Sequence, residues 1–148
     1  MKNSTWILLF CILISAATQS CTKSVDPATN NGSSPITAIL VVNTWKVNSF
    51  LDGTQDKTAN FTGITFTFDT TGVFSAGKDN DILTGSWTFS KLFHGVQVNS
   101  GSIKLDLGDR SPYGRLRGEW KIESFTPTKV VLTDEDDVNG DHLELIRL

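Results

Sequence analysis

Apolar and polar residues alternate with a period of two over most of the chain that follows Asn43. Ile64, Phe66 and Phe68, for example, lie on one face of such a segment, and polar residues lie between and after them. This period places successive side chains on opposite faces of a β-strand, so it predicts strands with one buried face. Eight such segments follow one another without a long helical pattern between them. The pattern therefore indicates an all-β domain.

Short turn signals join the predicted strands. They lie at Asp52–Thr54, Asp69–Gly72, Asp79–Asp81 and Thr126–Thr128, and Gly72 can take the positive φ that a hairpin turn requires. Strands at this spacing are typical of a β-sandwich or an up-and-down barrel. Because closure removes exposed strand edges, we expect an eight-stranded antiparallel up-and-down barrel.

One face of the predicted strands is expected to form the barrel interior. A barrel of eight strands is either filled by side chains or holds one small ligand, and both alternatives remain open. Gly85 and Ala76 leave space on inward faces, which would favour a small cavity. The predicted interior residues are Phe66, Phe68, Phe74, Trp87, Phe89, Leu105, Trp120, Ile122, Leu143 and Leu145. All of these except Ile122 and Leu145 are our candidate ligand contacts.

A short helix is predicted ahead of the first strand. Ser34 can serve as its N-cap and Pro35 suits the first helical position. Its apolar residues are expected to cover one end of the barrel, although a short first strand is an alternative. The folded domain is therefore expected to span residues 35–148.

The first 20 residues have the features of an export signal. Lys2 precedes an apolar run from Trp6 to Ala17, which is short for a membrane-spanning helix of about 20 residues. Ser20 then stands directly before Cys21. This order resembles the lipobox of bacterial lipoproteins, in which Cys21 would become the lipid-bearing N-terminus. An ordinary secretory signal or a short membrane anchor is the alternative.

Residues 21–34 are expected to form a flexible tether, because they offer almost nothing to bury. A flexible coil of this length reaches roughly 20 Å. Thr22 occupies the position where an inner-membrane retention signal usually has Asp. By analogy with bacterial sorting rules, we expect a lipid anchor in the outer membrane, with the domain facing the periplasm or the cell surface.

Charge and candidate chemistry narrow the function further. The formal net charge is −3 and no Lys/Arg cluster occurs, so nucleic acid is not an expected partner. We expect no enzymatic activity and no cofactor, because no nucleophile–base set or phosphate-binding loop can be identified. Once Cys11 is removed with the signal and Cys21 is acylated, no free thiol remains, so we expect no disulfide to stabilise the fold.

Metal sites are not expected either. The two histidines, His94 and His142, have no cysteine partners, and a zinc site would need both of them together with a carboxylate. The acidic segment Asp134–Asp141 departs from the EF-hand pattern, because with Gly140 as its sixth residue the twelfth is Ile146 rather than Glu. We interpret this segment as a solvated turn.

Several segments, taken together and in this order, resemble the lipocalin-like domains of small lipoproteins from Bacteroidetes-type bacteria. The resemblance covers roughly residues 36–148 and implies a calycin-type barrel of eight strands. It departs from lipocalins proper at Asn43, where those proteins have Gly in a Gly-x-Trp motif. The segments are Asn43–Val47, Phe61–Asp69, Thr71–Val73, Thr84–Trp87, Ser102–Leu107, Gly118–Ile122 and Asp141–Leu145.

The resemblance also implies a site and a function. In lipocalins an Arg near the end of the final strand packs over the Trp of the first strand, which here would pair Arg147 with Trp45 in a cation–π contact. Lipocalins bind small apolar molecules, so we expect a small hydrophobic or amphipathic ligand inside the barrel. The alternative is a solid barrel that binds an envelope protein. Its contact surface would be the loop Asp109–Arg117, which contains three Arg and one Tyr, residue types that are enriched at interfaces. Another interpretation of this loop is that it covers one mouth of the barrel.

Overall fold

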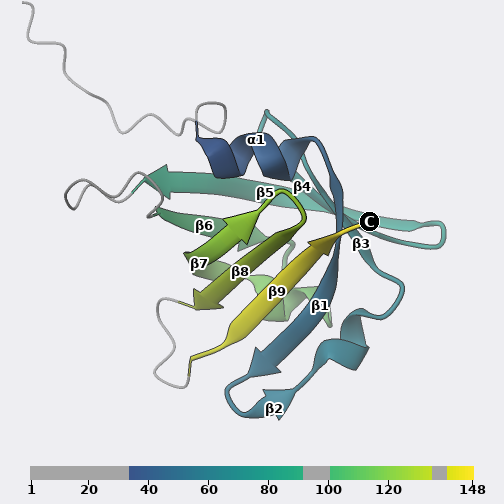
Figure 1. Ribbon diagram of the computed structural model, residues 1–148. Coiled ribbons are helices and arrows are strands. Elements are labelled where there is room, and N and C mark those ends of the chain that lie inside the picture. The colour runs from purple at the N-terminus through teal and green to yellow at the C-terminus, as the bar shows by residue number, and fades with distance from the viewer. Residues whose placement is uncertain (1–33, 92–100, 135–139) are drawn as a thin grey trace, which may run out of the picture.

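The computed structural model describes residues 34–91, 101–134 and 140–148, which form a β-barrel with short helices (Figure 1). The elements, in chain order, are α1 (Pro35–Val41), β1 (Thr44–Asp52), β2 (Gln55–Asp56), the 3-10 helix η1 (Thr58–Phe61), β3 (Thr65–Phe68), β4 (Val73–Lys78), β5 (Asp81–Lys91), β6 (Gly101–Asp106), the 3-10 helix η2 (Tyr113–Leu116), β7 (Gly118–Thr126), β8 (Lys129–Asp134) and β9 (His142–Arg147).

Eight antiparallel strands close on themselves. Each of β3 to β8 pairs with the next strand along the chain, and β1 pairs with both β3 and β9. The β1–β9 pairing runs from Trp45 opposite Arg147 to Leu51 opposite His142 and completes the circle. The predicted eight-stranded up-and-down barrel is therefore confirmed, and the two-residue strand β2 is an addition at the end of β1.

The alternating pattern decides which side chains enter the barrel. In β3, Phe66 and Phe68 are buried and Thr67 is exposed, and in β4 Phe74 and Ala76 are buried on the same face. One hydrophobic cluster collects these inward residues from all eight strands. The core therefore sits inside the barrel, as the sequence pattern predicts.

A β-bulge changes the inward face partway along β1. Trp45 is fully buried, and the strict alternation predicts that Phe50 lies on the opposite face. The register with β9 instead shifts between Val47 and Ser49, so that Phe50 is also fully buried. An extra residue in one strand reverses the alternation beyond it. The bulge therefore brings Phe50 into the barrel, on the same side of the wall as Trp45.

The predicted N-terminal helix is present and covers the end of the barrel where β1 begins (Figure 1). Ser34 is its N-cap residue and Pro35 its first residue. The Thr37 hydroxyl accepts the Ser34 N–H at 3.2 Å and donates to the Ser34 carbonyl at 2.7 Å. Ile36 and Leu40 are buried. The helix is thus an apolar cap, as predicted.

The opposite end of the barrel contains the β1–β2 hairpin and both 3-10 helices. Gly53 has a φ of +58°, which lets the chain turn sharply after β1. The Phe50 N–H then donates to the Thr58 hydroxyl at 2.9 Å, and the Lys57 N–H donates to the Phe50 carbonyl at 2.9 Å. These bonds hold η1 against β1 in a way that the alternating pattern does not predict.

The described helices include none that is both long and apolar enough to cross a membrane. The predicted export signal, Cys21 and nearly all of the tether lie outside the described residues, as does His94. The candidate site residues other than Cys21 all lie in the barrel domain.

Candidate functional site

The residues predicted to line the barrel interior all lie in its hydrophobic core. Of the eight candidate ligand contacts, Phe89 is the most exposed, at 9%, and the others are at 3% or less. The remaining seven are Phe66, Phe68, Phe74, Trp87, Leu105, Trp120 and Leu143. Their predicted location is confirmed, while a role in ligand contact stays a prediction.

Aromatic rings in the interior form one continuous series of contacts. Trp87 packs edge-on against Phe68 with ring centroids 5.3 Å apart, and Phe68 stacks on Phe74 at 4.7 Å. Phe74 stacks on Phe66 at 5.7 Å. Such geometries are the favourable ones for aromatic pairs.

The series continues through two rings that the prediction did not include. Phe61 of η1 lies 6.4 Å from Phe66 and 5.3 Å from Phe50, and Phe50 lies 6.3 Å from Trp120. The rings therefore connect Trp87 to Trp120 across the barrel. Phe50 was missed because of the bulge, and Phe61 because a single apolar residue between polar neighbours has no period.

Three buried indoles anchor the core to backbone carbonyls outside the strands. The Trp45 N–H donates to Leu40 at 3.0 Å, that of Trp87 to Asp69 at 3.0 Å, and that of Trp120 to Leu116 at 2.9 Å. A buried indole needs a hydrogen-bond acceptor. These bonds tie the wall of the barrel to α1, to the β3–β4 turn and to η2.

The predicted closure by Trp45 and Arg147 is present only as strand pairing. The two residues lie directly opposite each other on β1 and β9, but Trp45 is fully buried and Arg147 is exposed. Between these two described residues no ring–cation contact is found. At this end of the barrel, the contact of the Trp45 indole is instead with α1, where the Leu40 carbonyl accepts its N–H.

Gly85 does not leave the inward space that the sequence suggested. A Cβ placed on Gly85 would lie 1.9 Å from the carbonyl oxygen of Asp106 and 3.0 Å from the Cα of Leu107. The space is occupied by the backbone that follows β6. Glycine at this position allows two segments of the wall to approach closely, so the interpretation of Gly85 as a source of cavity volume was wrong.

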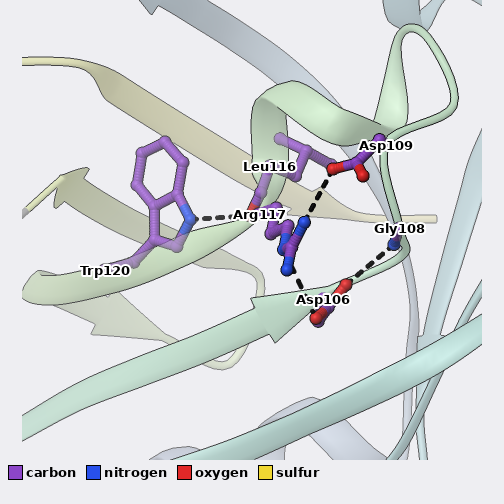
Figure 2. A network of polar contacts seen from close by, with 6 residues as sticks. All are labelled: Asp106, Gly108, Asp109, Leu116, Arg117 and Trp120. Atoms are coloured by element: carbon purple, nitrogen blue, oxygen red, sulfur yellow. Dashed lines mark hydrogen bonds and ion pairs between the residues drawn. The ribbon is translucent and has the colours of Figure 1, made fainter.

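The arginine-rich loop covers the end of the barrel opposite α1. Tyr113 and Leu116 of η2 are buried in the core. Figure 2 shows that the Leu116 carbonyl accepts the hydrogen bond from the Trp120 indole. The neighbouring residue Arg117 lies between Asp106 and Asp109. Arg117 meets Asp109 at 2.7 Å and Asp106 at 3.5 Å. Hydrogen bonding to Asp109, with the nearby charge of Asp106, raises the pKa of the Arg117 guanidinium.

The other two arginines of this loop also meet aspartates. Arg110 pairs with Asp81 at the start of β5, and Arg115 pairs with Asp52 at the end of β1 at 2.7 Å. Each of these arginine side chains is more than half exposed, so solvent screening leaves both pairs with little effect on stability. The loop is thus a cap with an apolar inner face and an exposed outer face of ion pairs.

The acidic segment before β9 has one structural role. The Asp141 carboxylate accepts a hydrogen bond from the Gly53 N–H at 2.6 Å and is 9% exposed. Asp141 therefore fastens the β1–β2 hairpin, whereas the sequence suggested only a solvated turn. Residues 135–139 of this segment lie outside the described part.

His142 is half-buried on β9, between Thr133 of β8 and Leu51 of β1. Among the residues that the structure describes, no group of three or more His, Cys, Asp and Glu side chains could hold a metal ion.

A groove of about 400 Å³ lies in the barrel wall beside β1. It was not predicted. Its lining comes from β1 (Lys46, Val47, Asn48), from η1 and the segment leading to β3 (Thr58, Phe61, Thr62, Gly63, Ile64), and from Thr65 and Leu148. The groove draws on residues that the alternating pattern assigns to separate elements, so only the folded chain reveals it.

These features define a closed all-β barrel of eight antiparallel strands with an aromatic core and a cap at each end. No family model, no curated protein and no solved structure matches the chain.

Proposed function

We propose that the protein is a lipocalin-like lipoprotein of the cell envelope that binds a small hydrophobic or amphipathic molecule through its barrel domain. The closed eight-stranded barrel with its aromatic interior supports this proposal, because a barrel of this size can hold one small ligand when side chains do not fill it. The export signal, Cys21 and the polar tether in the sequence support anchoring by lipid at the outer membrane.

A ligand inside the barrel would have to separate rings that already touch. Phe68, Phe74 and Phe66 are stacked at the centre of the interior. Such a ligand would also have to pass α1 at one end or η2 at the other. Interior binding therefore implies movement of a cap, and a ligand seated there would lower the exchange of buried amides with solvent.

The anchor is tested with Cys21→Ser. Cells that produce the wild-type chain are expected to label it with radioactive palmitate, and the variant is expected to be unlabelled and released from the membrane fraction. Because the core cluster of the described residues runs from Ile36 to Leu145, the variant should remain folded. Palmitate labelling that persists in Cys21→Ser would refute the anchor.

Ligand binding is tested by native mass spectrometry of the chain from residue 21 with Cys21→Ser, purified gently from the soluble fraction of the cells that produce it. A bound small molecule, or uptake of the amphipathic dye 1-anilinonaphthalene-8-sulfonate by the folded chain, is the expected result. A barrel that carries no ligand and takes up no amphiphile would refute ligand binding.

A second candidate is a solid barrel that binds an envelope protein. The unbroken series of ring contacts from Trp87 to Trp120 favours it, because it leaves the interior occupied. The exposed arginines of the 109–117 loop supply the contact surface in this case. Replacing Arg110 and Arg115 with Gln should then remove partners from a crosslinked envelope pull-down, and an unchanged set of partners would reject this interface.

A further inference from the structure

The seam between β1 and β3 is the least paired part of the barrel wall. These strands pair at only two positions, Thr44 opposite Thr67 and Trp45 opposite Phe66, whereas β1 pairs with β9 at six. β3 begins at Thr65, and farther along β1 it is η1 rather than β3 that contacts this strand, through the hydrogen bond from Phe50 to Thr58. The wall groove of about 400 Å³ lies at this seam.

The floor of the groove is apolar and continuous with the core. Phe61 and Ile64 line the groove, and both are also members of the core cluster with 3% exposure or less. Val47 packs against the same cluster, and Leu148 lines the groove while leaving 60% of its surface exposed. Sites for small ligands have volumes of about 300–1,000 Å³ and apolar linings. The groove meets the volume condition without any movement of a cap, and its lining combines the apolar side chains Val47, Phe61, Ile64 and Leu148 with polar ones.

The rim of the groove carries the Lys46 ammonium, while the Glu144 carboxylate, which accepts a hydrogen bond from the rim residue Asn48 at 2.6 Å, is paired with Lys129 at 3.2 Å. Lys46 is the charged residue among the ten that line it. Within the described residues, Lys46 takes part in no ion pair. Lys78 approaches from β4, because its Cε lies 3.6 Å from the position of a Cβ on Gly63. An exposed ammonium beside an apolar floor suits an anion attached to an alkyl chain.

We propose that this groove, rather than the interior, is the site for a single-chain amphiphile with a carboxylate head group. The alkyl chain would lie on Phe61, Ile64 and Leu148, and the carboxylate would meet the ammonium of Lys46. The inference rests on the proposed function for the premise that the domain binds an amphiphile. The inference differs from the proposed function in placing the ligand in the groove of the barrel wall, so that the aromatic interior stays packed.

The test is a titration of the ¹⁵N-labelled chain from residue 21, carrying Cys21→Ser, with decanoate below its micellar concentration. The amides of Val47, Thr62 and Gly63 are expected to shift. The indole N–H signals of Trp87 and Trp120 report on the interior and are expected to remain unchanged, because both donate to fixed backbone carbonyls.

The head group is tested with Lys46→Gln, a change at an exposed position that should leave the fold intact. The dissociation constant for decanoate is expected to rise about two- to fivefold, the range for an exposed charge pair, while that for the uncharged 1-decanol is unchanged. Lys104→Gln makes the same charge change on the exposed face of β6 and should alter neither constant.

The outcomes separate this inference from the proposed function. Decanoate that shifts the indoles of Trp87 and Trp120, with no effect of Lys46→Gln, would overturn the groove and leave a ligand-binding barrel. Equal loss of decanoate and 1-decanol binding in Lys46→Gln would overturn the charge-based recognition. A chain that binds neither amphiphile would overturn both.

Discussion

The substitution Gly85→Ala tests whether the backbone packing of the barrel wall is as tight as described. The new Cβ would lie 1.9 Å from the Asp106 carbonyl oxygen and 2.9 Å from its carbonyl carbon. Because the obstacle is backbone rather than a flexible side chain, β5 and the end of β6 must move apart. Overpacking of this kind costs typically about 1–3 kcal/mol of folding free energy.

Gly77→Ala in the neighbouring strand β4 is the matched control. Its Cβ would find its nearest neighbour at 3.5 Å, the Thr65 hydroxyl, which is an ordinary contact. Where the backbone accepts alanine, Gly→Ala stabilises by about 0.4–1 kcal/mol, because the unfolded chain loses conformational freedom. The two variants should therefore lie on opposite sides of the wild type and differ by about 1.4–4 kcal/mol in the free energy of unfolding.

Urea unfolding followed by tryptophan fluorescence measures this difference. With a slope of about 1–3 kcal/mol per molar urea, the midpoint of Gly85→Ala should lie roughly 0.5 M or more below that of Gly77→Ala. Equal midpoints for the two variants would show that β5 and β6 do not approach closely at Gly85, and the description of this part of the wall would be wrong.

Two further predictions concern the turn after β3 and the cap η2. Hydrogen bonds from the Thr71 side chain, the Val73 N–H and the Thr71 N–H lower the pKa of Asp69 in the folded protein. The ionised Asp69 carboxylate therefore stabilises the fold above the unfolded pKa of about 3.9, and this stabilisation is lost as the pH falls through the lower folded pKa. Thermal unfolding should show Asp69→Asn less stable than wild type at pH 6, with the gap closing toward pH 2, and a gap independent of pH would contradict this. Trp120→Phe removes the indole donor of the Leu116 carbonyl and should cost about 1–3 kcal/mol, with faster hydrogen exchange at the amides of η2 than in β3. Uniform exchange in that variant would show that the bond does not hold the cap.

The strands and the capping helix could be predicted because their signals are local. Phe66 and Phe68 alternate with polar residues, and the side chains of a strand have a period of two whatever the strand pairs with. Ser34 and Pro35 mark a helix start through their own backbone preferences. The closure of eight strands followed from their number and from the short turns between them.

The departures from prediction involve contacts between residues that are distant in the sequence. The bulge near Asn48 depends on the register of β1 against β9, so the alternation of β1 read alone assigns Phe50 to the wrong face. Gly85 meets the backbone of Asp106, and Asp141 meets Gly53, across long stretches of chain. Such contacts produce no periodic pattern in the sequence around either residue, so the alternation of apolar and polar positions does not predict them.

The sequence by itself therefore determined the class of the domain, most of the inward aromatic residues and the cap formed by α1, because each depends on a short run of residues and its backbone preferences. Only the tertiary structure decided which end each cap covers, how the rings from Trp87 to Trp120 touch, and where the wall opens into a groove. These features depend on the three-dimensional register of the strands. The groove in particular arises because β1 and β3 pair at two positions and then separate.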